Sequence, residues 1–194
     1  MANATARAAS GATALPYWRR VEDAIRSWVV IASGLPEQRV AFKWQERTAP
    51  PEASPAQASS IVIGLPTSIA IGEPVRSSST DLGQPLGREV ELRADQLREI
   101  GITVESYTGE VTGGASAREL LQRVQEGLEL LAVQARLEAE GVSVFDAGPI
   151  NFLPAIPSVG FEGRGLIEFR AYATGSVAER VGYIETAELA PSLS

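Results

Sequence analysis

Few residues in this sequence could do chemistry, and the side chains on which most catalytic sites depend are missing. The 194 residues include no histidine and no cysteine, and Lys43 is the only lysine. This composition removes the commonest general base, the commonest metal ligand and the base of the usual hydrolytic triads. It also excludes disulfide and thiolate chemistry. Carboxylates remain as candidate acids and bases.

Two pairs of neighbouring carboxylates could form such a site, Glu22 with Asp23 and Glu138 with Glu140. Each pair falls in a segment with helical spacing of apolar residues, where positions one or two apart do not face each other. A solvated helix face accounts for both pairs. No group of residues has the spacing of a metal site. We therefore expect no enzyme and no cofactor or metal.

Two glycine-rich segments could be phosphate-binding loops. Residues 109–114 precede a helical segment, but their spacing fits neither the P-loop nor the dinucleotide-binding motif, and no lysine follows. Residues 160–165 precede a strand-like segment, so they lack the helix N-terminus that binds phosphate. The simpler interpretations are a strand-to-helix turn for the first segment and a turn or subunit contact for the second.

The strongest secondary-structure signal covers residues 116–140. Apolar residues recur there at steps of three and four, at Ala117, Leu120, Leu121, Val124, Leu128, Leu131 and Ala135. Ser116 and Glu119 form a capping-box pattern at the start, and Gly141 marks the end. This pattern predicts one long amphipathic helix that lies across a sheet. A second helix is predicted from Pro16 to Ser33, with Trp18 and Trp28 as core or interface residues.

Alternating apolar residues predict strands in the rest of the chain, over residues 39–46, 61–71, 88–93, 101–107, 142–145, 166–174 and 183–189. Residues 73–87 contain a serine triplet with several prolines and glycines, and they predict a long protruding loop. Residues 175–181 predict a turn. Residues 1–14 are rich in alanine, serine, threonine and glycine, and they predict a flexible arm. The expectation is one α+β domain over residues 15–190, with two helices on a mixed, largely antiparallel sheet of about six strands.

The net charge of −7 argues against a surface that grips phosphates, although it suits a channel that lets nucleic acid pass without binding it. No stretch approaches the twenty apolar residues that a membrane-spanning helix needs, so no membrane partner is expected. The first fourteen residues contain no apolar block, so we do not expect them to be a secretory signal.

Several short segments in a defined order carry a family resemblance over residues 17–189. Trp44-Gln45 is followed by Ala49-Pro50-Pro51 and the strand at Ile61. A central strand over 103–109 leads into the long helix and the segment 137–142. The C-terminal part adds residues 151–155, 161–164 and 182–185. Together these segments resemble the phage neck terminator, or tail terminator, proteins of long-tailed bacteriophages. The chain departs from the family pattern at 162–165, where the family commonly has a fuller Glu-Arg-Ala run.

This resemblance implies a structural virion protein without catalytic activity. It implies a ring of identical subunits, usually six, that caps the tail tube, stops its growth and joins it to the head-side connector. DNA would pass through the lumen without specific binding. The location would be the virion tail or neck, and the host cytoplasm during assembly.

Candidate subunit-interface residues follow from the predicted C-terminal strands. Glu168, Arg170 and Tyr172 share one side of the strand 166–174, and Arg180 and Glu185 lie nearby if the last two strands pair as a hairpin. Arg164, in the glycine-rich segment before this strand, is a further candidate. An exposed, solvated strand face is the alternative interpretation.

Two other functions remain open at this stage. Within the same class, the chain could be a tail-completion or connector protein in an adjacent ring. Outside that class, it could be a small binding or scaffold domain of a cellular protein, with the apolar segment around Phe152 as its ligand groove. An enzyme ranks third because the chain lacks histidine and has a single lysine.

Overall fold

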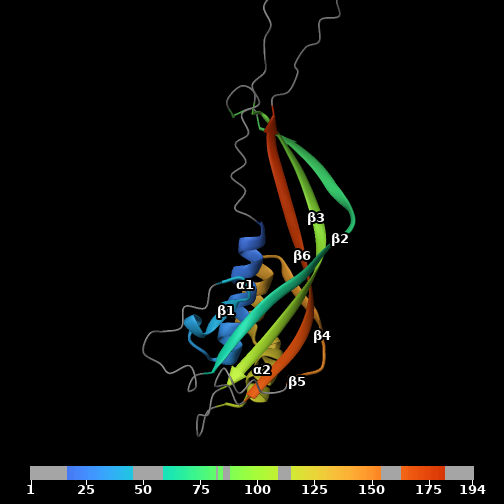
Figure 1. Cartoon of the computed structure of the whole chain (residues 1–194). Coiled ribbons are helices and arrows are strands. Elements are labelled where there is room, and N and C mark those ends of the chain that lie inside the picture. Colours follow the sequence, from blue (N-terminus) through green and yellow to red (C-terminus); the bar gives the residue numbers. More distant parts are fainter. Residues whose placement is uncertain are drawn as a thin grey trace, which may run out of the picture.

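The chain folds as one mixed sheet whose concave side holds the helices (Figure 1). The computed structural model describes residues 17–45, 59–81, 83–84, 88–108, 115–153 and 163–181. The helices of this part are α1 (Tyr17–Ser33), α2 (Ala117–Glu126) and α3 (Leu131–Ala139). The strands are β1 (Val40–Phe42), β2 (Ser60–Thr80), β3 (Val90–Thr108), β4 (Val142–Ala147), β5 (Asn151–Leu153) and β6 (Gly163–Val181).

The sheet order is β1-β2-β3-β6-β4, and β5 pairs with β6. β1 runs parallel to β2, and the other pairs are antiparallel. This confirms the predicted α+β fold with a mixed, largely antiparallel sheet of six strands. The number of helices differs from the prediction, because the described residues contain three α-helices rather than two.

Helix α1 packs one apolar face into the core. Its buried residues include Val21, Ile25 and Trp28, which follow helical spacing. The Trp28 indole donates a hydrogen bond of 3.0 Å to the carbonyl of Val124, and its ring meets Phe169 of β6 edge-on at 4.9 Å between centroids. Trp28 is therefore a core residue that joins α1 to α2 and to the sheet, because its ring is apolar and its single N–H is satisfied.

The predicted long helix begins where its sequence indicates but breaks in the middle. The Ser116 side chain accepts from the Glu119 backbone, and the Glu119 carboxylate accepts from the Ser116 backbone, so the capping box is formed. After α2 the chain passes through a short 3-10 turn (Gly127–Glu129) and restarts as α3. In α3 the buried residues are Val133 and Leu137, while Leu131 is 82% exposed. The expected apolar stripe therefore ends before Leu131.

The break occurs where α1 crosses this segment most closely. A Cβ atom on Gly127 would overlap the Cβ of Ala32. The bend thus lets the backbone at Gly127 approach α1 and rotates the following helix, so that a different set of side chains faces the core. Hydrophobic spacing alone did not signal this change, because Leu128 and Leu131 continue the pattern of α2.

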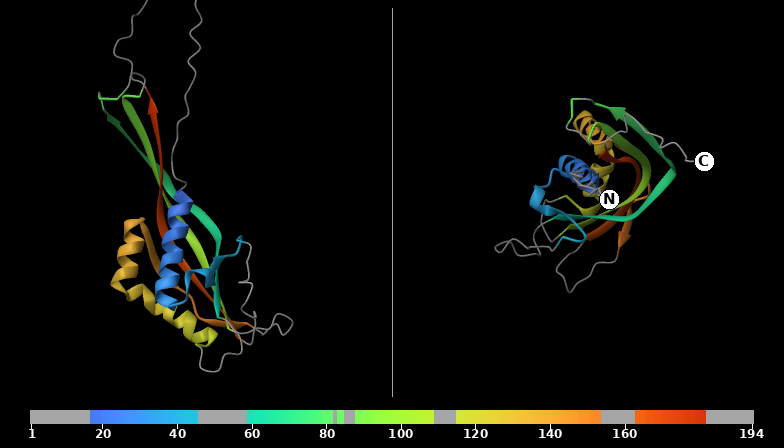
Figure 2. Two further views of the ribbon diagram at one scale, coloured as in Figure 1. Left: turned by 90° about the vertical axis from the view of Figure 1, so that its left-hand side faces the viewer. Right: turned by 90° about the horizontal axis from the view of Figure 1, so that it is seen from above.

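Strands β2, β3 and β6 are far longer than the sequence suggests, at 21, 19 and 19 residues. One end of these three strands lies against the helices, and the other end projects past α1 as a three-stranded extension (Figures 1 and 2). We call this extension the β-arm, and it comprises residues 67–80 of β2, 90–99 of β3 and 174–181 of β6.

The β-arm corrects two predictions. Residues 73–80, expected in a loop, belong to β2, and residues 175–181, expected as a turn, continue β6. The segment that connects β2 to β3 is confined to the tip of the β-arm, where the Asp81 amide donates to the Glu89 carbonyl at 2.7 Å. The serine triplet misled the prediction because a strand exposed on both faces needs no apolar alternation. The predicted last strand, 183–189, lies outside the described residues.

Two shorter differences concern β1 and the 148–160 segment. The strand predicted over 39–46 is limited to Val40–Phe42, and Trp44 lies in the following turn with its ring stacked on Phe42 at 4.6 Å. Within 148–160, expected as an extended connector, Asn151–Leu153 pairs with β6 as β5. No helix in the described part of the chain is long and apolar enough to span a bilayer.

Candidate assembly surface

The β-arm exposes both faces of a three-stranded sheet without a core of its own. Val75 is 69% exposed, and it pairs with Asp95 on the face turned away from the helices. Val177 is 65% exposed and pairs with Ala94 on the opposite face. A three-stranded sheet with no helix over it buries little apolar surface, so it gains little stability from the hydrophobic effect. Exposed apolar side chains such as these are typical of a surface that contacts another molecule.

Polar side chains hold the β-arm together across its strands. Arg180 of β6 pairs with Glu91 of β3 at 3.0 Å. Ser176 of β6 donates its hydroxyl to Asp95 of β3 and accepts a hydrogen bond of 3.1 Å from Arg93, which lies 2.9 Å from Asp95 on the same strand. The hydrogen bonds from Ser176 and Arg93 lower the pKa of Asp95 below its usual value. These cross-strand contacts maintain the register of the β-arm where no helix covers it.

The two long edges of the β-arm differ. In the described part of the chain, β1 pairs with β2 only at residues 61–63, and β4 pairs with β6 only at residues 169–173. The β2 edge carries Pro66 and Pro74 and has irregular register between Gly64 and Thr67 and between Ile71 and Val75. Prolines and bulges disfavour pairing with a further strand. The β6 edge over 174–181 has neither, so it is the better template for strand addition.

A second exposed surface lies at the base of the β-arm, on the sheet face away from the helices. The ring of Tyr172 stacks on Phe145 of β4, with centroids 4.2 Å apart and planes at 15°. Arg170 lies 3.6 Å from Glu99 and 3.9 Å from Asp146. We call these five side chains the waist patch, because they lie where the sheet narrows from four paired strands to three.

The structure thus brings together some of the predicted interface candidates and separates others. Glu168, Arg170 and Tyr172 alternate on one face of β6, and Glu168 is exposed there. Arg180 lies on the same strand, within the β-arm, and not on a hairpin partner. Glu185 lies outside the described residues. Phe145 was not among the candidates, because its neighbour Tyr172 becomes visible only once β4 pairs with β6.

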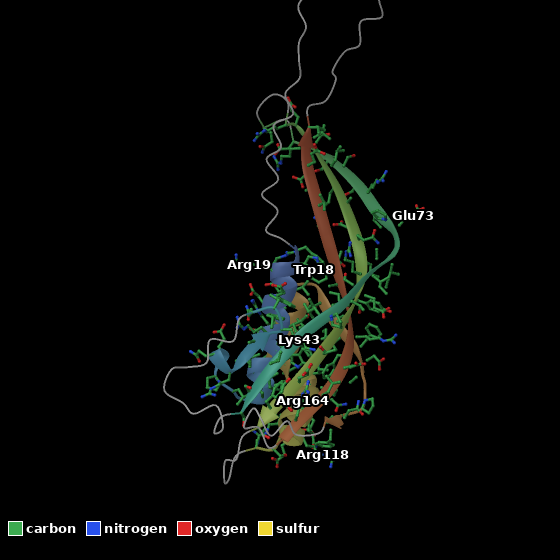
Figure 3. The ribbon with its side chains drawn as sticks, in the orientation of Figure 1. Trp18, Arg19, Lys43, Glu73, Arg118 and Arg164 are labelled. Atoms are coloured by element: carbon green, nitrogen blue, oxygen red, sulfur yellow. The ribbon has the colours of Figure 1, made fainter. Side chains whose placement is uncertain are left out.

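Arg164 belongs to a partly exposed charge cluster around the buried carboxylate of Glu105. Its guanidinium lies 2.7 Å from Glu105, and the ammonium of Lys43 lies 2.5 Å from the other carboxylate oxygen. Figure 3 labels Arg164 and Lys43, which both lie in the lower half of the molecule, away from the β-arm. The Tyr107 hydroxyl donates to Glu105 at 2.7 Å. Burial raises the pKa of Glu105, but hydrogen bonds from Lys43, Arg164 and Tyr107 outweigh it and lower the pKa to about 2. This cluster joins the turn after β1 to β3 and β6.

Among the described residues, no group of three or more acidic side chains is arranged to hold a metal ion. The neighbouring carboxylates Glu22 and Asp23 lie on α1, and burial is the main cause that raises the pKa of Glu22. Glu138 and Glu140 lie at the C-terminal end of α3, where Arg136 is 3.5 Å from Glu140.

The chain is similar to known proteins in sequence and in structure. A family model described as phage neck terminator protein matches residues 20–192, which confirms the resemblance seen in the sequence. No curated protein matches the chain. Among solved structures, the chain is similar to one titled as the sheath/tube terminator of an extracellular contractile injection system, PVC, in the extended state, determined by cryo-electron microscopy. The TM-score is 0.39 at 14% identity, and the alignment covers 91% of this chain and 65% of that chain.

Proposed function

The chain belongs to the phage neck terminator family, and from this membership we propose that it forms a ring of identical subunits that ends the tail and joins it to the head. The ring would cap the tail tube and present its other side to the head-side connector. The protein would act in the virion tail or neck and would reach it from the host cytoplasm during assembly. The observation that carries this proposal is the β-arm.

The β-arm supports a ring because it supplies two different kinds of edge. Closed rings use heterologous contacts, in which one surface of a subunit meets a different surface of the next. The β6 edge is regular, whereas the β2 edge is interrupted by prolines and irregular register. Because the two edges differ, a contact that joins the β6 edge of one subunit to another surface of the next subunit is heterologous. A homohexamer is the copy number we propose, in line with the resemblance described above.

The waist patch is the second contact surface in this proposal. Arg170 carries its charge at the surface between two carboxylates, and the Phe145–Tyr172 stack presents apolar area beside it. Aromatic residues and arginine are enriched at the centres of protein interfaces. Glu168 and Arg180 remain interface candidates on the same strand. Arg164 remains a candidate too, because its guanidinium is partly exposed while it pairs with the buried Glu105 of its own chain.

The charge of the chain supports a lumen through which DNA passes without being held. The net charge is −7, and a ring of six such subunits would repel phosphates rather than bind them. The tail tube protein and the head-side connector are then the partners that the exposed surfaces contact. No catalytic step and no cofactor enter this function.

The decisive experiment is to remove the protein from the phage that encodes it and to examine the particles by electron microscopy. We expect tails of abnormal length, or finished tails that stay separate from filled heads, and we expect the wild-type chain supplied in trans to restore joined particles. Val177→Lys, at an exposed position of the β-arm, should restore them poorly although the variant stays folded. Normal joined particles in the absence of the chain would reject the terminator function.

The mass of the purified chain gives an independent test. A ring-forming protein should yield a hexamer, or a monomer that becomes a ring on contact with purified tail tubes. Arg136→Glu, on the exposed side of α3, is a control that changes charge without touching the β-arm or the waist patch. A monomer that binds neither tubes nor connectors would contradict the proposal.

A further inference from the structure

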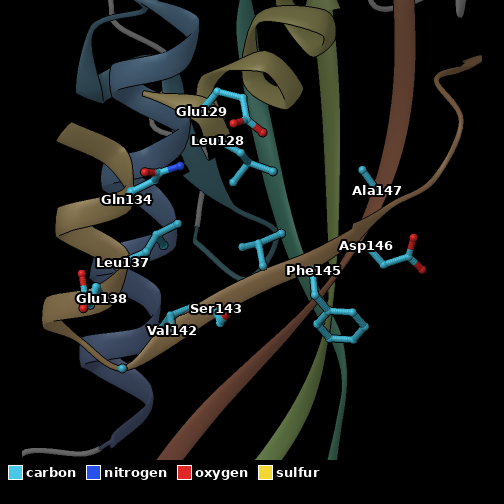
Figure 4. A pocket seen from close by; sticks show the side chains of 12 residues that line it. Leu128, Glu129, Gln134, Leu137, Glu138, Val142, Ser143, Phe145, Asp146 and Ala147 are labelled. Atoms are coloured by element: carbon cyan, nitrogen blue, oxygen red, sulfur yellow. The ribbon is translucent and has the colours of Figure 1, made fainter. Parts of the chain in front are cut away.

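A groove lies between the end of the sheet and the helix that covers it. Its volume is about 600 Å³, and it is lined on one side by α3 and the preceding turn and on the other by β4 (Figure 4). Leu128, Leu137 and Val144 line it with apolar surface. A groove between a strand and a helix of this kind is suited to hold an extended segment.

β4, the strand that lines the groove, is an edge strand of the sheet. Among the described strands, β4 pairs with β6 alone. Its register with β6 is regular from Val142 to Val144 and is interrupted before Asp146. The backbone groups on its other side therefore have no strand partner in the described part of the chain, and they can pair with an added strand.

The charged side chains that line the groove are all acidic. Glu129 and Glu138 have no described cation within 4 Å, and Asp146 has only Arg170, at 3.9 Å. An occupant should therefore carry positive charge. Of the chain segments outside the described residues, 1–16 is the one with a net positive charge, since it contains Arg7 and no acidic residue. The other such segments of six or more residues, 46–58, 109–114, 154–162 and 182–194, are each net negative.

The same segment also starts close to the groove. The ring of Tyr17 lies 3.4 Å from the position of a Cβ on Gly175, and Ala173, two residues earlier in β6, pairs with Val142. Two strand residues, one strand spacing and the tyrosine side chain add to about 17 Å. Five extended residues span about that distance, at ~3.3 Å each. With an extended backbone, residue 12 would lie beside Val142 and Arg7 would lie beside Ala147, at the end of β4 where Glu129 and Asp146 line the groove.

We propose that residues 1–16 fold back onto their own chain and lie in this groove as a strand antiparallel to β4. Alanine, serine and glycine dominate the segment, and these small side chains let its backbone approach the strand closely. Arg7 faces the acidic side chains at the far end of the groove. The inference does not depend on the terminator function.

The absence of cysteine from the natural chain makes a disulfide test specific. The full chain carrying Ala9→Cys and Gln134→Cys places one thiol in the segment and one at the groove. Under a mild oxidant it should form an intrachain disulfide about tenfold faster than the matched control, Ala9→Cys with Gln122→Cys. Gln122 is also an exposed glutamine, but it lies on α2 outside the groove. The rate should not depend on protein concentration.

Charge exchange tests the predicted register. Arg7→Glu should slow formation of the Ala9–Gln134 disulfide by about twofold to fivefold, as expected for one exposed ion pair. Glu129→Arg should slow it equally, and the combination of both should restore it. Equal rates in the Gln134 and Gln122 variants would overturn the proposal. So would a link that forms only between copies, because the groove would then hold a neighbour's segment. Ring formation and tail joining are measured separately, so either result leaves the terminator function untouched.

Discussion

The only lysine of the chain, Lys43, contacts a buried carboxylate, with its ammonium 2.5 Å from Glu105. The two residues are far apart in sequence, and the Glu105 side chain is 6% exposed while that of Lys43 is 52% exposed. A solvent-facing cation thus neutralises an acid that the sheet has removed from water, and Arg164 completes the pairing. This contact gives the fold a defined dependence on pH.

The stability of the chain should fall in acid through Glu105. The folded-state pKa of about 2 lies below the value of 4.5 that the group has without these contacts. A lowered pKa contributes stability above about pH 4.5, and this contribution is lost as the pH falls from 4.5 towards 2. The difference corresponds to at most about 3 kcal/mol, because solvent screens the half-exposed Lys43. Urea unfolding of the wild type at pH 7 and pH 3 should show the loss, and Glu105→Gln should show a smaller pH dependence and lower stability at pH 7. An unchanged pH dependence in Glu105→Gln would contradict this assignment.

The break between α2 and α3 predicts a contrast between two leucines. Leu137→Ala should lower the free energy of unfolding by about 2–5 kcal/mol, because Leu137 is 5% exposed. Leu131→Ala should change it by less than about 0.5 kcal/mol, because Leu131 is exposed. Denaturant unfolding of both variants measures the two values. A large loss in Leu131→Ala would favour one continuous helix with the original apolar stripe.

For Gly127→Ala, packing and helix propensity predict opposite changes in the free energy of unfolding. Alanine in place of glycine should favour a helical backbone by up to about 1 kcal/mol. The added Cβ would overlap Ala32, however, so Gly127→Ala should destabilise the protein by about 1–3 kcal/mol. Calorimetry or denaturant unfolding gives the sign. Ala32→Gly introduced together with Gly127→Ala should relieve the overlap, and a stabilising Gly127→Ala would show that α1 and the bend are farther apart.

Arg170→Glu should separate folding from assembly. The reversal places a third carboxylate beside Glu99 and Asp146, at a position exposed enough for the monomer to remain folded. We expect ring closure to weaken and particles to show overlong tails or unjoined heads. Circular dichroism and unfolding of the purified variant establish that it is folded, and electron microscopy of complemented lysates measures assembly. Normal particles with this variant would remove Arg170 from the interface.

Local sequence patterns correctly predicted the features that depend on neighbouring residues. The capping box at Ser116 and Glu119 formed as predicted, since both partners lie within one helical turn. Helix α1 followed its apolar spacing, and the core part of β6 followed the alternation of Ile167 and Phe169. The family resemblance was also readable, because it depends on the order of such local segments along the chain.

Features that depend on residues far apart in the sequence could not be predicted before the fold was known. The serines at 77–79 form a strand because they pair with β3 residues 91–93, and their own side chains indicate only a turn. The helix breaks at Gly127 because Ala32 lies against it. The Phe145–Tyr172 stack and the Lys43–Glu105–Arg164 cluster exist only in the paired sheet. In each case the energy comes from a contact between segments that the sequence separates, so no local pattern could reveal it.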